Sequence, residues 1–430
     1  MPTIPVVVVG AGPAGLAVSH ELAGRGVDHV VLDRGRTAES WRSRRWDSLR
    51  LLSPAWATRL PGLPAAADPD AFLSAGALVD LLTGYAAGAA LPVVERAEVL
   101  SVRPRGSLYR IVSTGGTWLS RAVVVATGDS AVPAVPTLAA SLPRSVVQLT
   151  TAEYRRPEQV PDGPVLVVGA SASGVQLADE LAAAGRDVVL AVGRHTRMVR
   201  SYRGMDIYWW LDQLGSLDRH VDTVPDRAVA LREPSPQLVG HAGSAGDERD
   251  VSLTSLASRG VRLVGRVVGA DGSHVAFDED LAVTTAAADA RLARFLRRVD
   301  DHIAARGLDE EFLDAGPRPA PVHVPATPTR LSVSGGGFRT VLWATGYRRS
   351  DPWLERAAPE AARSVLEMGR AASAPGLYVV GRRWQSRRSS GLLAGIGADA
   401  RLVTAELVRR LPRTAFSVPH RRPLEPEPRS

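Results

Sequence analysis

Two glycine-rich turns carry the clearest chemical signal in this sequence. Residues 6–22 read VVVVGAGPAGLAVSHEL and residues 165–181 read VLVVGASASGVQLADEL, so one unit occurs twice. In each copy an apolar run, typical of a buried parallel strand, passes through small residues into a segment of helical periodicity. Such a turn lets the backbone approach a pyrophosphate, and the following helix N-terminus presents free amides to it. The sequence therefore predicts two dinucleotide sites.

The first copy has a carboxylate at the end of its next predicted strand. That strand, VVLD, ends in Asp33 and is followed by Arg34. A carboxylate there is placed to accept the hydroxyls of an adenosine ribose that lacks a 2′-phosphate. Because two dinucleotide sites in one chain imply hydride transfer between them, we expect this copy to bind FAD. Its candidate binding residues are Gly10, Gly12, Pro13, Ala14, Gly15, Asp33 and Arg34.

The second copy differs from the first at two places. Ser171 replaces the middle glycine, and the strand at 187–192 ends without a carboxylate. Arginines follow that strand instead, and a guanidinium suits a 2′-phosphate. NADP(H) is therefore favoured over NAD(H), and a solvated turn is the alternative for the arginines. The candidate residues are Gly169, Ser171, Ser173, Gly174, Arg194, His195 and Arg197.

Three further apolar runs place the two units in one architecture. The runs VVVATGDS (123–130), VLWATGY (341–347) and GLYVVG (376–381) read as buried strands, and the first two end in Ala-Thr-Gly. We expect an α/β fold of two Rossmann-like domains, with Thr127, Gly128, Thr345 and Gly346 at the cofactors. The FAD domain would be discontinuous, at 1–158 and 335–430. The NAD(P)H domain would be inserted at 159–334, with a variable insert at about 212–330. Proline-bearing stretches at 155–164 and 317–330 are the expected crossings.

Composition excludes several kinds of chemistry. The chain has no Cys, no Lys and no Asn, and all 52 basic residues are Arg. Without Cys there is no disulfide, no thiolate metal site and no redox dithiol. The nine His are dispersed, so we expect no metal site.

The high pI does not predict a nucleic-acid partner. The pI near 10.4 follows from the high pKa of Arg and a net charge of +7. The RRW and SRR runs are read as a solvated or anion-facing surface rather than a nucleic-acid site. Residues 1–20 lack a basic leading region and contain glycines, so we expect neither a signal peptide nor a membrane span, and a cytoplasmic protein.

Because the chain lacks Cys, disulfide reductases of this architecture are excluded. Oxygen, a quinone, an iron–sulfur partner or a directly reduced substrate remain as electron acceptors. The segments SWRSRRWDSLRLLSP (40–54), AEYRRP (152–157), ATGY (344–347) and the terminal GLYVVG…SSGLLAGIGADA resemble the class B flavoprotein monooxygenases. The closer resemblance is to the flavin-containing monooxygenase branch and its bacterial group often labelled potassium-transport flavoproteins. It implies FAD on the first turn, NADPH on the second, and transfer of one oxygen atom through a C4a-(hydro)peroxyflavin.

The sequence departs from the family pattern at two places. The fingerprint F-x-G-x-x-x-H-x-x-x-Y keeps only Tyr154, which weakens an assignment to Baeyer–Villiger enzymes. An Asn that follows the SWR-like segment in many flavin-containing monooxygenases is replaced here by Leu52 or Ser53. N- or S-oxygenation is therefore favoured, followed by ketone-to-ester insertion.

The resemblance also implies roles for single residues. Trp41 and Arg42 would lie along FAD. Trp46 and Asp47 come next, with Asp47 as a catalytic candidate and core packing or capping as the equal alternative. Ser390 and Gly391 would begin the last helix and turn their amides to the flavin.

Two more segments are candidates for the substrate or nicotinamide side of the site. Arg203 is a candidate partner for the nicotinamide or the oxygenated flavin. The cluster Tyr208–Trp210 would line a pocket or pack in the core.

We therefore expect an NADPH- and oxygen-dependent FAD monooxygenase acting on a small molecule. The main alternative is an NAD(P)H–FAD reductase that passes electrons to a quinone or an iron–sulfur protein. A flavin-binding sensor or partner-binding module is the third reading. The sequence leaves the substrate open, and a homodimer is one option for the oligomeric state.

Overall fold

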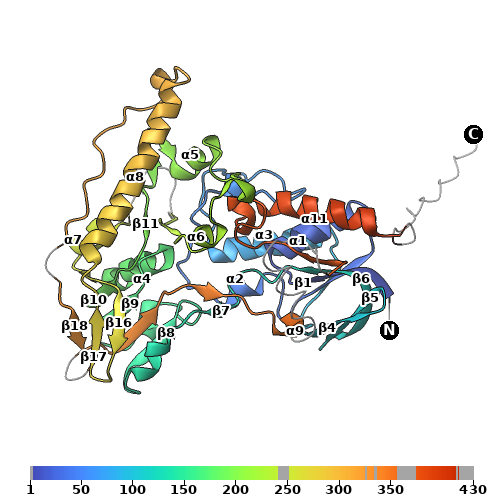
Figure 1. Cartoon of the computed structure of the whole chain (residues 1–430), viewed down its shortest axis with the longest axis horizontal. Coiled ribbons are helices and arrows are strands. Elements are labelled where there is room, and N and C mark those ends of the chain that lie inside the picture. Colours follow the sequence, from blue (N-terminus) through green and yellow to red (C-terminus); the bar gives the residue numbers. More distant parts are fainter. Residues whose placement is uncertain are drawn as a thin grey trace, which may run out of the picture.

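The computed structural model describes residues 3–240, 251–324, 327–333, 337–355, 374–412 and 415. Two large sheets form the centres of two domains that lie side by side (Figure 1). The first domain contains the N-terminal strand and the last helix, and the middle of the chain forms the second. Within the described ranges, no helix is long and apolar enough to cross a membrane, and no cluster of side chains is suited to a metal ion.

The first sheet is parallel at its centre and ends in an antiparallel meander. Its order is β3-β2-β1-β6-β5-β4, and β21 also pairs with β6 in parallel. Alternate valines of β1 face opposite cores. Val6 and Val8 pack on α1, α3 and α11, whereas Val7 and Val9 pack on β4, β5 and α9. The strands are β1 (Thr3–Val9), β2 (His29–Leu32), β3 (Val93–Val94), β4 (Val99–Arg105), β5 (Leu108–Ser113), β6 (Gly116–Val125) and β21 (Leu377–Val379). The helices are α1 (Pro13–Ala23), α2 (Glu39–Ser43), α3 (Ala75–Gly88), α9 (Pro352–Glu355) and α11 (Ile396–Arg410).

The second sheet is parallel throughout, in the order β15-β10-β9-β19-β8. Helices α4 (Ala172–Ala183) and α7 (Leu253–Ser258) cover one face, and a small antiparallel sheet of β16, β17 and β18 covers the other. Strands buried on both faces explain the continuous apolar runs in the sequence. The strands are β8 (Val147–Thr150), β9 (Val165–Val168), β10 (Val188–Ala191), β15 (Arg262–Val264), β16 (Val267–Ala270), β17 (His274–Phe277), β18 (Arg330–Ser332) and β19 (Thr340–Trp343).

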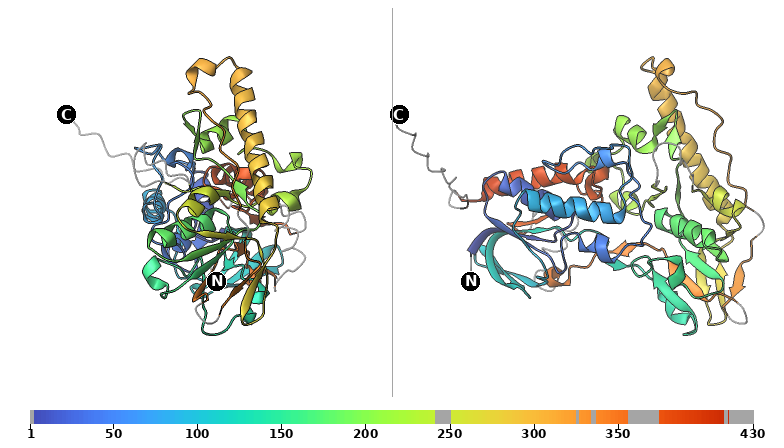
Figure 2. Two further views of the ribbon diagram at one scale, coloured as in Figure 1. Left: turned by 90° about the vertical axis from the view of Figure 1, so that its left-hand side faces the viewer. Right: turned by 180° about the vertical axis from the view of Figure 1, so that it is seen from behind.

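A helical region extends beyond the second sheet. The long helix α8 (Leu281–Ala304) projects past it (Figure 2) and shares an apolar core with α5 (Ile207–Gln213). The apolar residues of α8 recur at helical spacing on one face, as expected for a helix that packs on one side. The short elements here are β11 (Thr196–Arg197), β12 (Ser201–Tyr202), β13 (Met205–Asp206), α6 (Arg227–Leu231) and β14 (Pro236–Gln237). The 3₁₀ turns of the chain are η1 (Ala55–Ala57), η2 (Thr137–Ser141), η3 (Pro157–Gln159), η4 (Val221–Thr223), η5 (Asp309–Glu311) and η6 (Arg388–Gly391).

The crossings between the domains differ from the predicted boundaries. Strands β8 and β19 were expected in the FAD domain, but both pair in the second sheet. The chain crosses at β7 (Val132–Pro133) and returns at β20 (Tyr347–Arg348), and the two strands pair with each other. The proline-bearing stretch at 155–164 and the described residues of the stretch at 317–330 lie within the second domain instead. Both Ala-Thr-Gly motifs end a central parallel strand, so the motif alone does not reveal to which sheet it belongs.

Candidate functional site

The first glycine turn closes between β1 and α1. Gly10 has a φ of +109°, and a Cβ there would lie 2.6 Å from the carbonyl oxygen of Ala126. A Cβ at Gly15 would overlap the carbonyl oxygen of Gly10. In contrast, a Cβ at Gly12 would meet nothing within 4 Å. The outer glycines therefore hold strand and helix together, and the middle one borders the open space that a pyrophosphate needs.

The N-terminus of α1 is uncapped. Gly12 is its N-cap and Pro13 follows, with no side-chain cap and no acidic residue in the first turn. Its amides are therefore available to an anion. Ala14 is buried against the end of β21, where a Cβ at Gly381 would lie 2.6 Å from the Ala14 Cβ.

Asp33 lies beside this turn at the end of β2, as predicted. Its Oδ2 accepts the backbone N–H of Ala11 at 2.6 Å, and its Oδ1 accepts that of Gly35 at 2.8 Å. Each oxygen keeps a lone pair for a ribose hydroxyl. Burial raises the pKa of Asp33, and the two backbone bonds oppose that shift. Arg34 is exposed.

The segment after α2 joins the two domains. Trp41 packs against the apolar cores of both domains. Arg42 donates to the carbonyl oxygen of Thr37 at 3.1 Å and to the hydroxyl of Thr83 in α3 at 2.8 Å. Trp41 is thus at the junction where a flavin is expected, whereas the guanidinium of Arg42 is held against the first domain.

Trp46 and Asp47 do not lie as expected for residues at the cofactor. Trp46 is buried in the core of the second domain, in the cluster that also contains Tyr154. Asp47 is exposed, and its backbone N–H donates to the carbonyl oxygen of Arg155 at 2.9 Å. The structure gives no support to Asp47 as a catalytic residue, because its side chain lies at the surface.

Sequence reasoning missed Arg45, which lies between two aromatic rings at the same junction. Its guanidinium carbon is 5.0 Å from the ring centroid of Trp41 and 5.8 Å from that of Tyr347. Burial lowers the pKa of Arg45, and the neighbouring Arg44 and Arg155 lower it further. The RRW run contains Arg45, but the sequence pattern indicates only a solvated or anion-facing surface there.

The first Ala-Thr-Gly motif is fixed by a buried ion pair. The Arg382 guanidinium donates to Asp351 at 2.6 Å, to the Thr127 hydroxyl at 3.2 Å and to the Gly128 carbonyl. The Thr127 hydroxyl donates to the other Asp351 oxygen at 2.6 Å. Thr127 and Gly128 therefore lie just after the end of β6, and Arg382 and Asp351 are the residues that hold them.

The second glycine turn repeats the first. A Cβ at Gly169, whose φ is +107°, would lie 2.6 Å from the carbonyl oxygen of Ala344, and one at Gly174 would overlap the Gly169 oxygen. Ser171 is the N-cap of α4 and makes no side-chain cap, so its hydroxyl is available. Ser173 is half-buried in the first turn of that helix.

The second Ala-Thr-Gly motif lies beside this turn and not at the first one. The Thr345 hydroxyl donates to the carbonyl oxygen of Ala134 at 2.7 Å, and a Cβ at Gly346 would meet nothing within 4 Å. The two residues therefore border the nicotinamide unit. Both glycine turns lie at the carboxyl ends of their strands, the edge where α/β sheets bind ligands.

Only one of the three residues predicted at the 2′-phosphate is free to bind it. Arg194 is exposed and donates to the Arg232 carbonyl at 2.8 Å. His195 is fully buried, and burial lowers its pKa. Arg197 forms a buried ion pair with Asp289 at 2.5 Å. The last two are therefore structural residues.

The helix α8 supplies a second cation that the sequence analysis did not identify. Arg291 donates to the carbonyl oxygen of His195 at 2.5 Å. Burial, together with the neighbouring Arg294 and Arg194, lowers its pKa. The guanidinium groups of Arg194 and Arg291 thus lie near the end of β10, where a 2′-phosphate is expected. The sequence pattern assigns this stretch only to the variable insert and predicts no helix there.

Arg203 and the aromatic cluster have structural roles in the helical region. Arg203 pairs with Asp300 of α8 at 3.2 Å, which gives no support to its predicted role beside the cofactors. Trp210 is fully buried and donates to the Tyr202 carbonyl at 2.7 Å. Trp209 packs edge-on against Trp210. The cluster therefore forms the core between α5 and α8.

Ser390 and Gly391 lie in the turn η6 and do not begin the last helix. The Ser390 hydroxyl accepts the backbone N–H groups of Ser386 at 3.1 Å and of Arg387 at 3.0 Å. Helix α11 begins only at Ile396. The apolar residues continue across Gly395 in the sequence, whereas the backbone becomes helical only after it. The sequence pattern therefore placed the start of the last helix too early.

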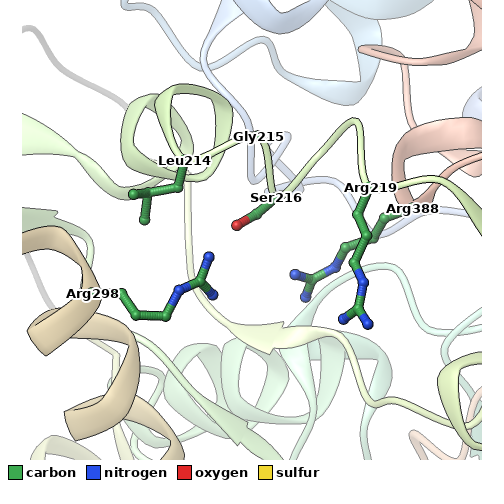
Figure 3. Close-up of a pocket in the computed structure, with 6 residues that line it drawn as sticks. All are labelled: Leu214, Gly215, Ser216, Arg219, Arg298 and Arg388. Carbon is green, nitrogen blue, oxygen red and sulfur yellow. The ribbon is translucent and has the colours of Figure 1, made fainter. Parts of the chain in front are cut away.

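A pocket of about 370 Å³ adjoins η6. Guanidinium groups from three segments surround it, together with a serine hydroxyl (Figure 3). Its lining residues are Leu214, Gly215, Ser216, Arg219, Arg298 and Arg388.

Comparisons with known proteins agree with this arrangement. Residues 7–211 match the family described as Pyridine nucleotide-disulphide oxidoreductase. An uncharacterized CzcO-like oxidoreductase of Geobacillus kaustophilus is 27% identical over 94% of this chain and 98% of its own. The indole-3-pyruvate monooxygenase YUCCA1 of rice is 36% identical, over 41% of this chain and 44% of its own.

Solved structures share the two-domain fold. A flavin-containing monooxygenase from Stenotrophomonas maltophilia has a TM-score of 0.62 at 20% identity, over 95% of this chain and 99% of that one. The bacillithiol disulfide reductase Bdr of Staphylococcus aureus has a TM-score of 0.58 at 11% identity, over 96% and 100%. The comparisons confirm the predicted resemblance to the class B flavoprotein monooxygenases, and the chain is an oxidoreductase with the two-domain fold of FAD- and NADP-binding flavoproteins.

Proposed function

We propose that this protein is an NADPH- and oxygen-dependent FAD monooxygenase that oxygenates a small molecule. One observation carries the proposal. Two glycine turns of the same build lie at the carboxyl ends of parallel strands in the two sheets. One lies beside the carboxylate of Asp33, and the other lies beside Arg194 and Arg291, for which no ion pair is found among the described residues. This pairing fits one unphosphorylated and one 2′-phosphorylated dinucleotide.

FAD fits the first turn. The open side of Gly12 and the uncapped N-terminus of α1 would receive the pyrophosphate, and Asp33 would receive the ribose. Trp41 lies between the cores of both domains, where a flavin would meet a nicotinamide. Bound there, FAD supplies hydride acceptance and reaction with oxygen.

NADPH fits the second turn. Ser171 and the N-terminus of α4 would receive its pyrophosphate, and Arg194 and Arg291 its 2′-phosphate. Arg45, held between Trp41 and Tyr347, places a half-buried positive charge between the two sites. This charge favours binding of the anionic cofactors at the junction.

Oxygen is the proposed electron acceptor, and the absence of Cys excludes only the dithiol route that disulfide reductases use. The fold alone is shared by monooxygenases and by disulfide reductases. A dithiol that takes electrons from the flavin requires Cys, so this chain lacks that route. A relative named as an indole-3-pyruvate monooxygenase matches 41% of this chain.

Within this function, N- or S-oxygenation is favoured over ketone-to-ester insertion, because only Tyr154 of the fingerprint remains and it is buried in a core. The second candidate is an NAD(P)H–FAD reductase for a quinone or an iron–sulfur protein. The absence of Cys is equally compatible with that reading.

The test is aerobic NADPH consumption by the FAD-loaded protein with a panel of amines, thioethers and ketones. Hydrogen peroxide and oxygenated product are measured together. The proposal expects one class of compound to accelerate NADPH loss with matching product. NADPH loss that yields only peroxide with every compound contradicts it.

A further inference from the structure

The pocket beside η6 is surrounded by positive charge from three separate segments. Ser216 and Arg219 come from the loop after α5, Arg298 comes from α8, and Arg388 begins η6. Figure 3 shows the guanidinium of Arg298 facing those of Arg219 and Arg388 across the pocket, with the Ser216 hydroxyl directed between them. Like charges gathered around one space disfavour each other unless an anion lies between them.

The acidic residues nearby do not neutralise this charge. Arg388 pairs with Glu233 at 3.0 Å. Among the described residues, no carboxylate lies within ion-pair distance of Arg219 or Arg298, whose side chains make no acidic contact. Asp218, the neighbour of Arg219 in sequence, pairs with Arg387 at 3.4 Å. Three cations therefore face one carboxylate around the pocket.

The pocket is joined directly to the turn that we expect beside the flavin. The backbone N–H of Arg388 donates to the Arg219 carbonyl at 3.0 Å, and that of Ser389 donates to the Leu217 carbonyl at 3.0 Å. The next two residues of the turn, Ser390 and Gly391, are the ones predicted at the flavin. A molecule held in the pocket would thus lie directly against η6.

The 2′-phosphate of NADPH is accounted for elsewhere. Arg291 is held near His195 and Arg194, at the end of β10. Arg298 lies two helical turns further along α8, about 10 Å away along the axis at 1.5 Å per residue. The two arginines therefore serve different places on the helix.

We propose that this pocket binds the carboxylate of an organic-acid substrate, with Arg219, Arg298 and Arg388 as donors and Ser216 as a further donor. That the pocket binds an anion follows from the pocket alone. That this anion is a substrate rests on the proposed function. Guanidinium groups bind carboxylates through paired, charge-assisted hydrogen bonds. The volume of about 370 Å³ suits a small molecule.

The test is isothermal titration calorimetry of the FAD-loaded full chain with phenylacetate and 3-phenylpropionate, each against its neutral amide. We expect at least one carboxylate to bind at least tenfold more tightly than its amide. Arg298→Gln should remove that preference. Arg297→Gln removes the same charge from an exposed neighbour on α8 and should retain it.

Three results overturn the inference: no carboxylate binds more tightly than its amide, Arg297→Gln weakens binding as much as Arg298→Gln, or Arg298→Gln weakens NADPH instead. Failure of the proposed function gives a different result. In that case the carboxylate preference is retained, and the reduced enzyme forms no oxygenated product with oxygen.

Discussion

Arg382 and Asp351 form a buried ion pair, 2.6 Å apart, at the place where both crossings between the domains meet the first sheet. Their side chains are 3% and 1% exposed. Asp351 follows β20 on the returning crossing, and Arg382 also binds Thr127 and Gly128, where the outgoing crossing begins. The pair thus fixes both crossings to the end of β21.

Removal of Arg382 should therefore destabilise the protein strongly. Arg382→Gln leaves the Asp351 carboxylate buried without its cation, which costs about 3–5 kcal/mol in comparable pairs. Urea unfolding of the purified protein measures the loss. Arg383→Gln, at an exposed position next to it, is the control and should change stability by less than about 1 kcal/mol. Equal effects of the two variants would show that the pair does not hold the crossings.

The glycines of the first turn should separate folding from cofactor binding. Gly15→Ala introduces a Cβ that overlaps the Gly10 carbonyl, so we expect misfolding or a large loss of stability. Gly12→Ala meets no protein atom within 4 Å and should fold, yet it should lose FAD. Gly84→Ala in α3, which also meets nothing, should retain FAD. Flavin absorbance per protein measures how much FAD is retained. Full retention of FAD by Gly12→Ala would contradict the proposal that this turn binds the pyrophosphate.

Cofactor choice should depend on Arg194. Arg194→Gln removes an exposed guanidinium at the proposed 2′-phosphate site, so the KM for NADPH should rise roughly 10- to 100-fold, in line with loss of one charge-assisted hydrogen bond. The KM for NADH should stay unchanged. Arg262→Gln, at the opposite end of the sheet, is the control. An equal rise of the KM for NADPH and for NADH would contradict the proposal that Arg194 binds the 2′-phosphate.

The stability of the second domain should depend on pH through Glu180. Burial raises the pKa of Glu180 to about 7, from an ordinary value of 4.5. The folded protein therefore holds this proton more tightly than the unfolded chain, and the stabilisation is lost as the pH rises through 7. Relative to Glu180→Gln, the wild-type protein should lose unfolding free energy between pH 5 and pH 8. Glu310→Gln, at an exposed position, should follow the wild type, and a pH-independent gap for Glu180→Gln would contradict this expectation.

The sequence predicted the parts of the fold that depend on local pattern. The two glycine turns and Asp33 stand where their spacing placed them, because turn, helix and strand follow each other closely in the chain. The domain boundaries failed because β19 and β6 carry the same motif, and pairing over long distance decides their sheet. Arg197 and Arg203 were misread because their partners, Asp289 and Asp300, lie on the distant α8.

The same limit explains the residues that the sequence did not reveal. Arg382 is one of several arginines in a basic run, and its partner Asp351 is distant in sequence. The pocket beside η6 is assembled from three segments whose arginines look like ordinary surface residues when each is read alone.

The most direct test of the central proposal is a stopped-flow experiment on protein that has been reduced anaerobically with NADPH. The reduced protein is mixed in separate runs with oxygen and with a quinone. We predict that oxygen reoxidises the flavin through a transient near-UV absorbance, and that an accepted substrate shortens the lifetime of that absorbance. Rapid reoxidation by the quinone, with slow reoxidation by oxygen and no transient, would contradict the oxygenase proposal and favour the reductase.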